Sequence, residues 1–241
     1  MAPSTPGPLI LVGGAEFMPG NEAQDAVWAE AAAGRPAYVV ATAAVRQDPD
    51  RAVATARRWF ASRGVRVREL RIRGRRDAAD PTVVAAAGEA GAFYLCGGDP
   101  GLVVELLIGT PAWDAIVTAW RNGAALAGSS AGAMAMGEWS LIRAGMSHDR
   151  RRFAPALGLL PRTAVVPHLE EFGERWLPAL ELPRADAVLI GLDTRTAAIW
   201  RPRIGWRAMG PARVAVIRGT DRRNVTDGAR PTGLPSPLRR A

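Results

Sequence analysis

Two serines stand between glycines at the point where an apolar run meets a stretch of small residues. The segment Gly-Ser-Ser-Ala-Gly spans residues 128–132, with Ser130 at its centre. This spacing matches the nucleophile elbow Gly-X-Ser-X-Gly, in which a strand turns at once into a helix and projects a serine hydroxyl above the sheet. The pattern predicts covalent catalysis by Ser130, with Ser129 as the alternative nucleophile. A serine that merely caps a small-residue helix has the same sequence signature.

A serine hydroxyl is a weak nucleophile without a neighbouring base, and two histidines are candidates for that base. His168 ends the apolar run Thr-Ala-Val-Val-Pro-His, so we expect it at the same carboxyl edge of a sheet as Ser130. His148 lies in a polar, arginine-rich stretch that is typical of a surface loop. These positions favour His168 as the general base, and a structural histidine is the alternative.

A third apolar run ends in Leu-Cys-Gly-Gly-Asp-Pro-Gly, residues 95–101. Paired glycines let a ligand approach the backbone, so Gly97 and Gly98 are candidate ligand contacts whose amides can stabilise an oxyanion. The amide of Ala131, at the start of the helix after the elbow, is a second candidate donor. Asp99 is a candidate substrate contact, and an aspartate followed by proline equally fits the N-terminus of a helix.

Strands that alternate with helices must position these residues. This alternation predicts an α/β fold with a mainly parallel sheet, helices on both faces and ligands at the carboxyl ends of the strands. Residues 65–72 alternate apolar and charged side chains, as an edge strand does. We expect strands at 8–14, 37–43, 65–72, 92–98, 124–130, 163–168, 187–193, 196–200 and 212–218, and helices at 21–33, 49–63, 80–90, 101–108, 112–121 and 170–180.

Domain organisation follows from the absence of any linker composition within this pattern. Residues 1–218 are expected to form a single α/β hydrolytic domain. Residues 219–241 are rich in arginine, glycine and proline, so we expect a flexible C-terminal tail.

The content of cysteine, histidine and apolar residues excludes several classes of protein. Cys96 is the only cysteine, which excludes an internal disulfide and fits a reducing cytoplasm. Two histidines and one cysteine are too few for zinc, although carboxylates leave other metals open. No apolar run approaches the roughly 18 residues of a membrane span, and the N-terminal residues do not resemble a secretory signal. We therefore expect a cytoplasmic protein without membrane association.

The net charge is +8, and all 31 basic residues are arginine, so lysine catalysis is excluded. Such a charge is compatible with a nucleic-acid partner. However, the arginines are spread along the chain, with modest clusters at 66–76, 150–152 and 213–223, and aromatic residues are not interleaved with them. We expect a solvated basic surface that favours acidic substrates, and no nucleic-acid partner.

Four blocks, in their order along the chain, resemble the serine peptidases that include aspartyl dipeptidase (peptidase E) and cyanophycinase. The resemblance covers roughly residues 8–218 and implies a three-layer fold of the class I glutamine amidotransferase (flavodoxin-like) kind, with serine in place of cysteine at the elbow. An amidotransferase subunit is disfavoured for that reason. The blocks are FYLCGGDPGLVVELL, AGSSAGAMAMG, VVPH and IGLDTRTA.

The resemblance implies roles for particular residues. Ser130 matches the family nucleophile, His168 its base, and Gly98 and Ala131 the oxyanion donors. The family's third catalytic member is a glutamate at the position that Thr194 occupies here.

An orienting carboxylate must therefore come from another residue. Asp193 is adjacent to the family position and is the first candidate. Glu170 is the alternative, because glutamine amidotransferases place a carboxylate two residues after the histidine.

The resemblance implies a serine peptidase that cleaves small peptides or aspartyl-containing amide bonds without a metal or cofactor. Residues 147–153 resemble a histidine- and arginine-containing stretch of cyanophycinase-like members, and arginines suit an acidic side chain through bidentate pairing. A homodimer is compatible with the sequence. The threonine at position 194 supports an alternative, a weakly active or non-catalytic binding or regulatory protein on the same fold.

Overall fold

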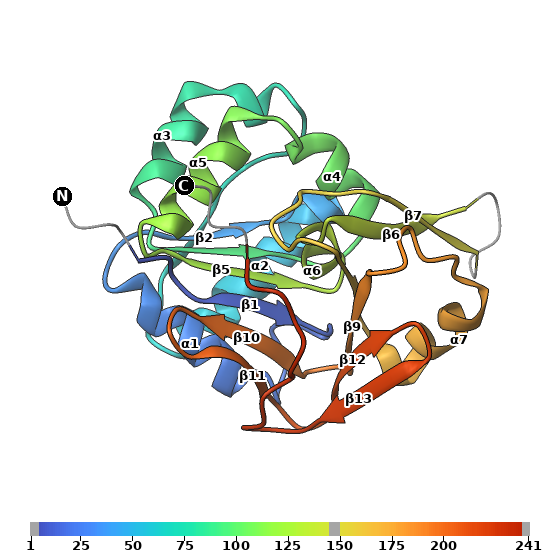
Figure 1. The fold of residues 1–241 in the computed structure, drawn as a ribbon. Coiled ribbons are helices and arrows are strands. Elements are labelled where there is room, and N and C mark those ends of the chain that lie inside the picture. The colour runs from blue at the N-terminus through green and yellow to red at the C-terminus, as the bar shows by residue number, and fades with distance from the viewer. Residues whose placement is uncertain (1–4, 145–149, 238–241) are drawn as a thin grey trace.

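The computed structural model describes residues 5–144 and 150–237, and a seven-stranded sheet forms its centre (Figure 1). The strand order is β11-β10-β1-β5-β4-β2-β3. The five strands from β1 to β3 in this order pair in parallel, whereas β10 and β11 join antiparallel at one edge. The strands are β1 (Leu9–Val12), β2 (Ala37–Val40), β3 (Val67–Glu69), β4 (Ala92–Leu95), β5 (Ala125–Ser129), β10 (Ala197–Arg201) and β11 (Gly205–Met209).

Helices cover both faces of this sheet because the side chains of a strand alternate between them. In β4, Phe93 belongs to the buried cluster that contains Trp113 of α5, whereas Tyr94 belongs to the cluster that contains Trp28 of α1. The three-layer α/β fold is therefore confirmed. The helices are α1 (Glu22–Ala32), α2 (Pro49–Ala61), α3 (Pro81–Glu89), α4 (Pro100–Leu107), α5 (Pro111–Arg121) and α6 (Ala131–Ala135), with short 3-10 turns η1 (Thr42–Ala44) and η2 (Asp77–Ala79).

A second, four-stranded sheet and a hairpin lie beside the carboxyl ends of the central strands (Figure 1). The sheet has the order β13-β12-β9-β8, in which only β8 and β9 are parallel among the described strands. A π-helical turn η3 (Leu169–Gly173) and two short turns, α7 (Glu174–Trp176) and η4 (Leu177–Ala179), replace the long helix expected at 170–180. The strands are β8 (Thr163–Val166), β9 (Val188–Leu192), β12 (Val214–Arg218) and β13 (Asp221–Val225), and the hairpin is β6 (Trp139–Arg143) with β7 (Arg151–Pro155).

Residues 219–237 differ from the flexible tail that their composition predicts. β13 pairs antiparallel with β12, and the chain then returns along β11. There Trp206 Nε1 donates to the carbonyl of Pro235 at 2.8 Å, and the Ala208 amide donates to the carbonyl of Ala229 at 2.9 Å. Strands β11 and β12 offer unpaired backbone groups that composition alone does not reveal, and this segment satisfies them.

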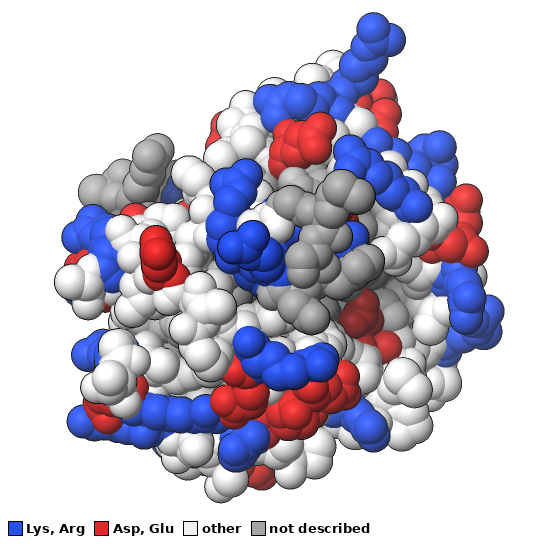
Figure 2. All heavy atoms as spheres, turned by 90° about the vertical axis from the view of Figure 1, so that its right-hand side faces the viewer, with Lys and Arg blue, Asp and Glu red and all other residues white. Residues whose placement is uncertain are grey.

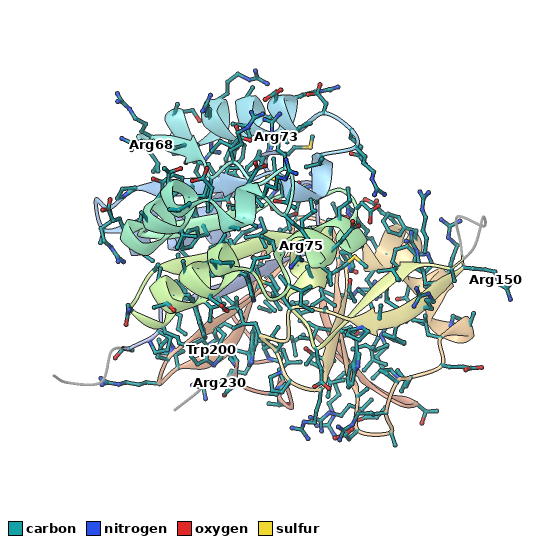
Figure 3. The ribbon with its side chains drawn as sticks, turned by 90° about the horizontal axis from the view of Figure 1, so that it is seen from above. Arg68, Arg73, Arg75, Arg150, Trp200 and Arg230 are labelled. Carbon is teal, nitrogen blue, oxygen red and sulfur yellow. The ribbon has the colours of Figure 1, made fainter. Side chains whose placement is uncertain are left out.

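The arginines are distributed over the molecule. In Figure 3, Arg68 of β3, Arg150 just before β7 and Arg230 in the C-terminal segment lie far apart. On the face that Figure 2 presents, arginines stand beside carboxylates rather than forming one continuous positive field. Arg73, for example, forms ion pairs with two carboxylates, one of them that of Asp50.

The longest helix in the described part of the chain is α2, with 13 residues. No single helix there is both long and apolar enough to cross a membrane; α4 and α5 meet the criteria only as a pair bent by 97°. No group of three or more His, Cys, Asp or Glu side chains within the same residues is arranged to hold a metal ion.

Candidate active site

Ser130 forms the turn between β5 and α6, with φ 48° and ψ −112°. A non-glycine residue at positive φ stores strain, of the order of 1–3 kcal/mol, and such strain clusters at functional sites. A Cβ added to Gly128 would lie 2.6 Å from the carbonyl carbon of Gly132, and one added to Gly132 would lie 2.3 Å from the carbonyl oxygen of Leu95. The glycines are therefore required because strand and helix approach each other without room for side chains.

His168 follows β8 and brings its imidazole to the Ser130 hydroxyl, with Nε2 3.3 Å from Oγ. Its backbone is left-handed, at φ 47° and ψ 45°, and its amide donates to the carbonyl of Gly13 at 2.9 Å. Phe172 stacks on one face of the ring, with centroids 4.8 Å apart. The structure thus brings together the serine and the histidine favoured by the sequence, whereas the other histidine, His148, lies outside the described residues.

Gly14 lies against the imidazole ring. A Cβ at this position would lie 2.1 Å from Cε1 and 2.2 Å from Nε2 of His168, and the φ of Gly14 is +125°. Only glycine fits, because both the space and the backbone conformation exclude a side chain. Gly13 and Gly14 end the strand expected at 8–14, and this pair of glycines is the sequence signal for a close contact at that point.

The two carboxylates expected behind the imidazole lie elsewhere. Asp193 accepts hydrogen bonds from the amide of Arg213 at 3.1 Å and from its Nε at 2.8 Å, and this carboxylate raises the pKa of the Arg213 guanidinium. Glu170 accepts the amide of Thr194 at 2.8 and 3.0 Å. Successive residues after a strand point to opposite sides, so Asp193 faces β12 while Thr194 faces His168.

Thr194 and Glu171 are the residues that approach the outer nitrogen of the imidazole. The Thr194 hydroxyl oxygen lies 3.2 Å from His168 Nδ1, and Glu171 Oε2 lies 3.4 Å from the same atom. Thr194 also donates its hydroxyl proton to Glu171 Oε1 at 2.9 Å. Sequence analysis missed Glu171; the signal was its position three residues after the histidine, a spacing that places side chains on one face of a helical turn.

Glu16 is a second residue that sequence analysis missed. Its Oε1 accepts the amide of Gly97 at 2.7 Å, and its Oε2 accepts the hydroxyl of Ser129 at 2.7 Å. This carboxylate therefore joins the loop after β1, the turn after β4 and the end of β5. The available signal was an acidic residue directly after a strand that ends in glycines.

The turn that follows Gly97 leaves another amide free. Gly98 has a φ of +139°, and a Cβ there would lie 2.3 Å from the carbonyl oxygen of Ala43. Within the described residues, the Gly98 amide donates to no protein acceptor. Asp99 instead caps α4, accepting the amide of Gly101 at 2.8 Å, so the helix-capping interpretation of this aspartate applies.

A cleft of about 520 Å³ opens above Ser130 and His168. One wall is the loop that carries Glu16, and the other is the start of α2 with Asp48 and Arg51. The catalytic candidates therefore face a space that is large enough for a short peptide and lined by groups of both charges.

A pocket of about 300 Å³ adjoins the cleft and shares Gly98 with it. Three arginines, Arg46, Arg143 and Arg151, line this pocket. Asp99 is also part of its wall. The pocket therefore places several arginines close to the turn that carries Gly98.

The chain is similar to solved structures of peptidases and to curated cyanophycinases. A peptidase from an acI-B1 actinobacterium aligns with a TM-score of 0.83 at 28% identity, covering 94% of this chain and 97% of its own. A putative peptidase E from Listeria monocytogenes aligns with a TM-score of 0.59 at 15% identity, covering 92% and 98%. The cyanophycinases of Synechococcus elongatus and Thermosynechococcus vestitus are each 25% identical over 223 residues, covering 89% of this chain and 69% of theirs.

The family model of Peptidase family S51 matches residues 9–201, which include every site residue described above except Arg213. The match runs from the first strand of the central sheet to the end of β10. This chain belongs to peptidase family S51.

Proposed function

We propose that the protein is a serine peptidase of the peptidase E and cyanophycinase kind, which cleaves small peptides or aspartyl-containing amide bonds through an acyl-enzyme. The observation that carries the proposal is the 3.3 Å contact between His168 Nε2 and Ser130 Oγ, at a strained turn that faces the cleft. Membership of a peptidase family supports hydrolysis of peptide bonds.

In the proposed reaction, Ser130 Oγ attacks the carbonyl carbon of the scissile bond while His168 Nε2 takes the hydroxyl proton. The tetrahedral intermediate collapses, the C–N bond breaks, and His168 returns the proton to the departing amine. Water then attacks the acyl-enzyme with His168 again as base, which releases the acid product and restores the serine. The negative charge on the carbonyl oxygen needs donors during both steps.

The amides of Gly98 and Ala131 are the proposed donors. The Gly98 amide has no acceptor within the described residues, and Ala131 is the first residue of α6, where backbone amides lack partners inside the helix. The amide of Gly97 is not available as a third donor, because it already donates to Glu16. Glu16 thereby positions the turn that presents Gly98.

The arginine-lined pocket supports an acidic side chain beside the scissile bond. A carboxylate that entered it would meet Arg46 and Arg143 in place of water, and guanidinium groups bind carboxylates in a bidentate fashion. The resemblance to aspartyl dipeptidase and cyanophycinase agrees with this charge preference. We propose that the pocket, which is next to Gly98, recognises the substrate aspartate.

Labelling with a fluorophosphonate probe tests the nucleophile. The probe is expected to modify the wild-type chain and Ser129→Ala, but not Ser130→Ala. Ser129 is the matched control, because its hydroxyl is fully buried and bound to Glu16. Labelling that persists in Ser130→Ala contradicts the assignment of Ser130.

A peptide panel tests the substrate class. Hydrolysis of aspartyl and β-aspartyl dipeptides is expected to exceed that of the matching asparaginyl peptides. Arg143→Gln should reduce this preference about 10- to 150-fold, since a charge-assisted hydrogen bond is worth roughly 1.5–3 kcal/mol. Equal rates for acidic and neutral peptides contradict the proposed role of the pocket.

The second candidate function is a binding or regulatory protein without catalysis, and the threonine at position 194 is the observation that favours it. A wild-type chain that neither reacts with the probe nor cleaves any peptide of the panel, yet binds aspartyl peptides, establishes this alternative.

A further inference from the structure

The hydroxyl of Thr194 has a defined role in the hydrogen-bond network around the imidazole. A threonine hydroxyl has one proton to donate, and Thr194 donates it to Glu171 Oε1 at 2.9 Å. Toward His168 Nδ1, 3.2 Å away, the oxygen is therefore available only as an acceptor. The ionised carboxylate of Glu171, with Oε2 3.4 Å from Nδ1, is also an acceptor.

Both groups beside Nδ1 therefore require a proton on this nitrogen. In a neutral imidazole, a proton on Nδ1 leaves Nε2 with a free lone pair. Nε2 is the atom that faces Ser130 Oγ. The arrangement accordingly selects the tautomer that a general base for Ser130 must have.

Further hydrogen bonds fix the positions of Thr194 and Glu171 relative to the imidazole. Glu170 accepts the backbone amide of Thr194, so the threonine cannot rotate away with its loop. Glu171 belongs to the turn η3, in which the amides of residues 171, 172 and 173 all donate to the carbonyl of His168. The turn therefore fixes Glu171 relative to the histidine that it serves.

We propose that Thr194 and Glu171 together replace the single carboxylate that is absent from position 194: the threonine hydroxyl accepts the Nδ1 proton, and Glu171 orients and polarises that hydroxyl. Both are positioning residues for the imidazole. This inference rests on the proposed function and deepens it, since it assigns the third part of the catalytic unit. Asp193 takes no part, because its carboxylate is bound to Arg213.

The exposure of the Glu171 side chain sets the size of the loss in kcat that we expect from its substitution. The side chain of Glu171 is 52% exposed, so water screens its charge more than it screens a buried carboxylate. Loss of a buried triad aspartate lowers kcat about 10⁴-fold through the wrong tautomer. We expect the smaller loss of about 10- to 100-fold for Glu171→Gln.

Histidine tautomers can be measured without any substrate. With two histidines in the chain, two-bond ¹H–¹⁵N correlations of His168 are readily assigned by comparison with His148→Gln. The wild-type imidazole is expected to carry its proton on Nδ1. In Glu171→Gln an amide NH2 donor replaces one of the two carboxylate acceptors and can itself donate to Nδ1, so the population should shift toward the Nε2–H tautomer. Thr194→Val should shift it in the same direction.

Matched controls separate this role from a general structural effect. Thr194→Ser keeps the hydroxyl and should keep the wild-type tautomer. Glu181→Gln makes the same change of charge at an exposed position and should leave the spectrum unchanged. A tautomer population that is unaltered in both Glu171→Gln and Thr194→Val overturns the inference.

Kinetics with a cleavable aspartyl peptide give a second measurement. Glu171→Gln and Thr194→Val should lower kcat about 10- to 100-fold and leave KM within about threefold, while Glu171→Asp recovers part of kcat. A raised KM with unchanged kcat contradicts positioning and indicates substrate contact. If the wild-type chain is inactive, the proposed function fails, and the tautomer measurement still decides the inference.

Discussion

The elbow and the histidine segment meet at one pair of atoms but are built in different ways. The elbow is one continuous stretch, residues 125–135, in which every side chain except the partly exposed Ser130 is buried. The histidine segment depends on partners from separate parts of the chain, namely residues 13–14 and Thr194, and on Glu171, which is half exposed. One region is thus part of the core, and the other is assembled on its surface.

This difference predicts different consequences of mutation. A change in the elbow affects the close contact between β5, β4 and α6, and hence the fold itself. A change around His168 affects the orientation of one ring, and hence activity before stability. Proteins often carry such separately adjustable residues on loops that a rigid scaffold positions.

The largest effect is expected from Gly128→Ala. The new Cβ would lie 2.6 Å from the carbonyl carbon of Gly132, and the buried backbone has no direction in which to move. We expect insoluble protein or a loss of more than about 4 kcal/mol in the free energy of unfolding. Gly88→Ala is the control, because its Cβ meets no atom within 4 Å in a helix that prefers alanine. Denaturant unfolding measures the free energy of unfolding of both variants. Equal values for Gly128→Ala and Gly88→Ala contradict the view that the elbow is part of the core.

Gly14→Ala should separate activity from stability. The added methyl group would displace the His168 ring, and a misplacement of about 1 Å costs roughly 100-fold in rate. The free energy of unfolding should fall by about 1–3 kcal/mol, because of the positive φ. Gly64→Ala also has a positive φ but open space around its Cβ, so it should lose stability without losing activity. Peptide hydrolysis and thermal unfolding measure the two effects.

A buried carboxylate in α1, that of Asp25, makes stability depend on pH independently of catalysis. Asp25 accepts the indole N–H of Trp59 at 2.7 Å, and burial raises the pKa of its carboxyl to about 7. The folded state therefore retains a proton that the unfolded chain, with a pKa of about 3.9, has released. This contribution to stability is fully present below pH ~4 and is lost as pH rises through about 7.

Asp25→Asn should remove this dependence. At pH 8 the variant should exceed the wild type by about 1–3 kcal/mol in the free energy of unfolding, and the difference should vanish toward pH 4. Urea titrations at a series of pH values measure it. A constant difference across this range contradicts the raised pKa. The same curves separate the pH profile of folding from that of the chemistry at His168.

The smallest effect is expected from Asp193→Asn. Its carboxylate binds Arg213, whose side chain is 39% exposed, so removal of the charge should cost about 1 kcal/mol of stability. Because Asp193 does not contact His168, kcat should change less than about threefold. A fall comparable to that of Glu171→Gln assigns Asp193 to the catalytic unit after all.

The order of elements could be predicted largely from local pattern. The apolar runs at 8–14, 92–98 and 124–130 became the neighbouring strands β1, β4 and β5, since buried parallel strands have a continuous apolar signature. Of the late strands, β8, β9, β10 and β12 were predicted, whereas the hairpin of β6 and β7 and the strands β11 and β13 were not. The division of the late strands between two sheets was not predicted either. Pairing partners depend on which edge is open, and no local pattern encodes that.

The site divides in the same way. Ser130, His168 and the turn at Gly97 and Gly98 were predicted as site residues because each follows an apolar strand, and the carboxyl ends of parallel strands lie at one edge of a sheet. Glu16 and Glu171 were missed because the hydrogen bonds that bring them into the site join segments distant in the sequence, and a glutamate near a strand end or a histidine is too common to single out by itself. Asp193 was favoured through adjacency in sequence, which does not determine the side of the chain that a residue faces.

The sequence by itself determined the five parallel strands of the central sheet, the small-residue turn that strains Ser130, and the placement of a histidine at the same sheet edge, because these follow from residue volume and apolar periodicity. Tertiary structure decided which carboxylate reaches which partner. Hydrogen bonds between distant segments depend on side-chain direction and on a few tenths of an ångström, and these arise only when the second sheet packs against the first.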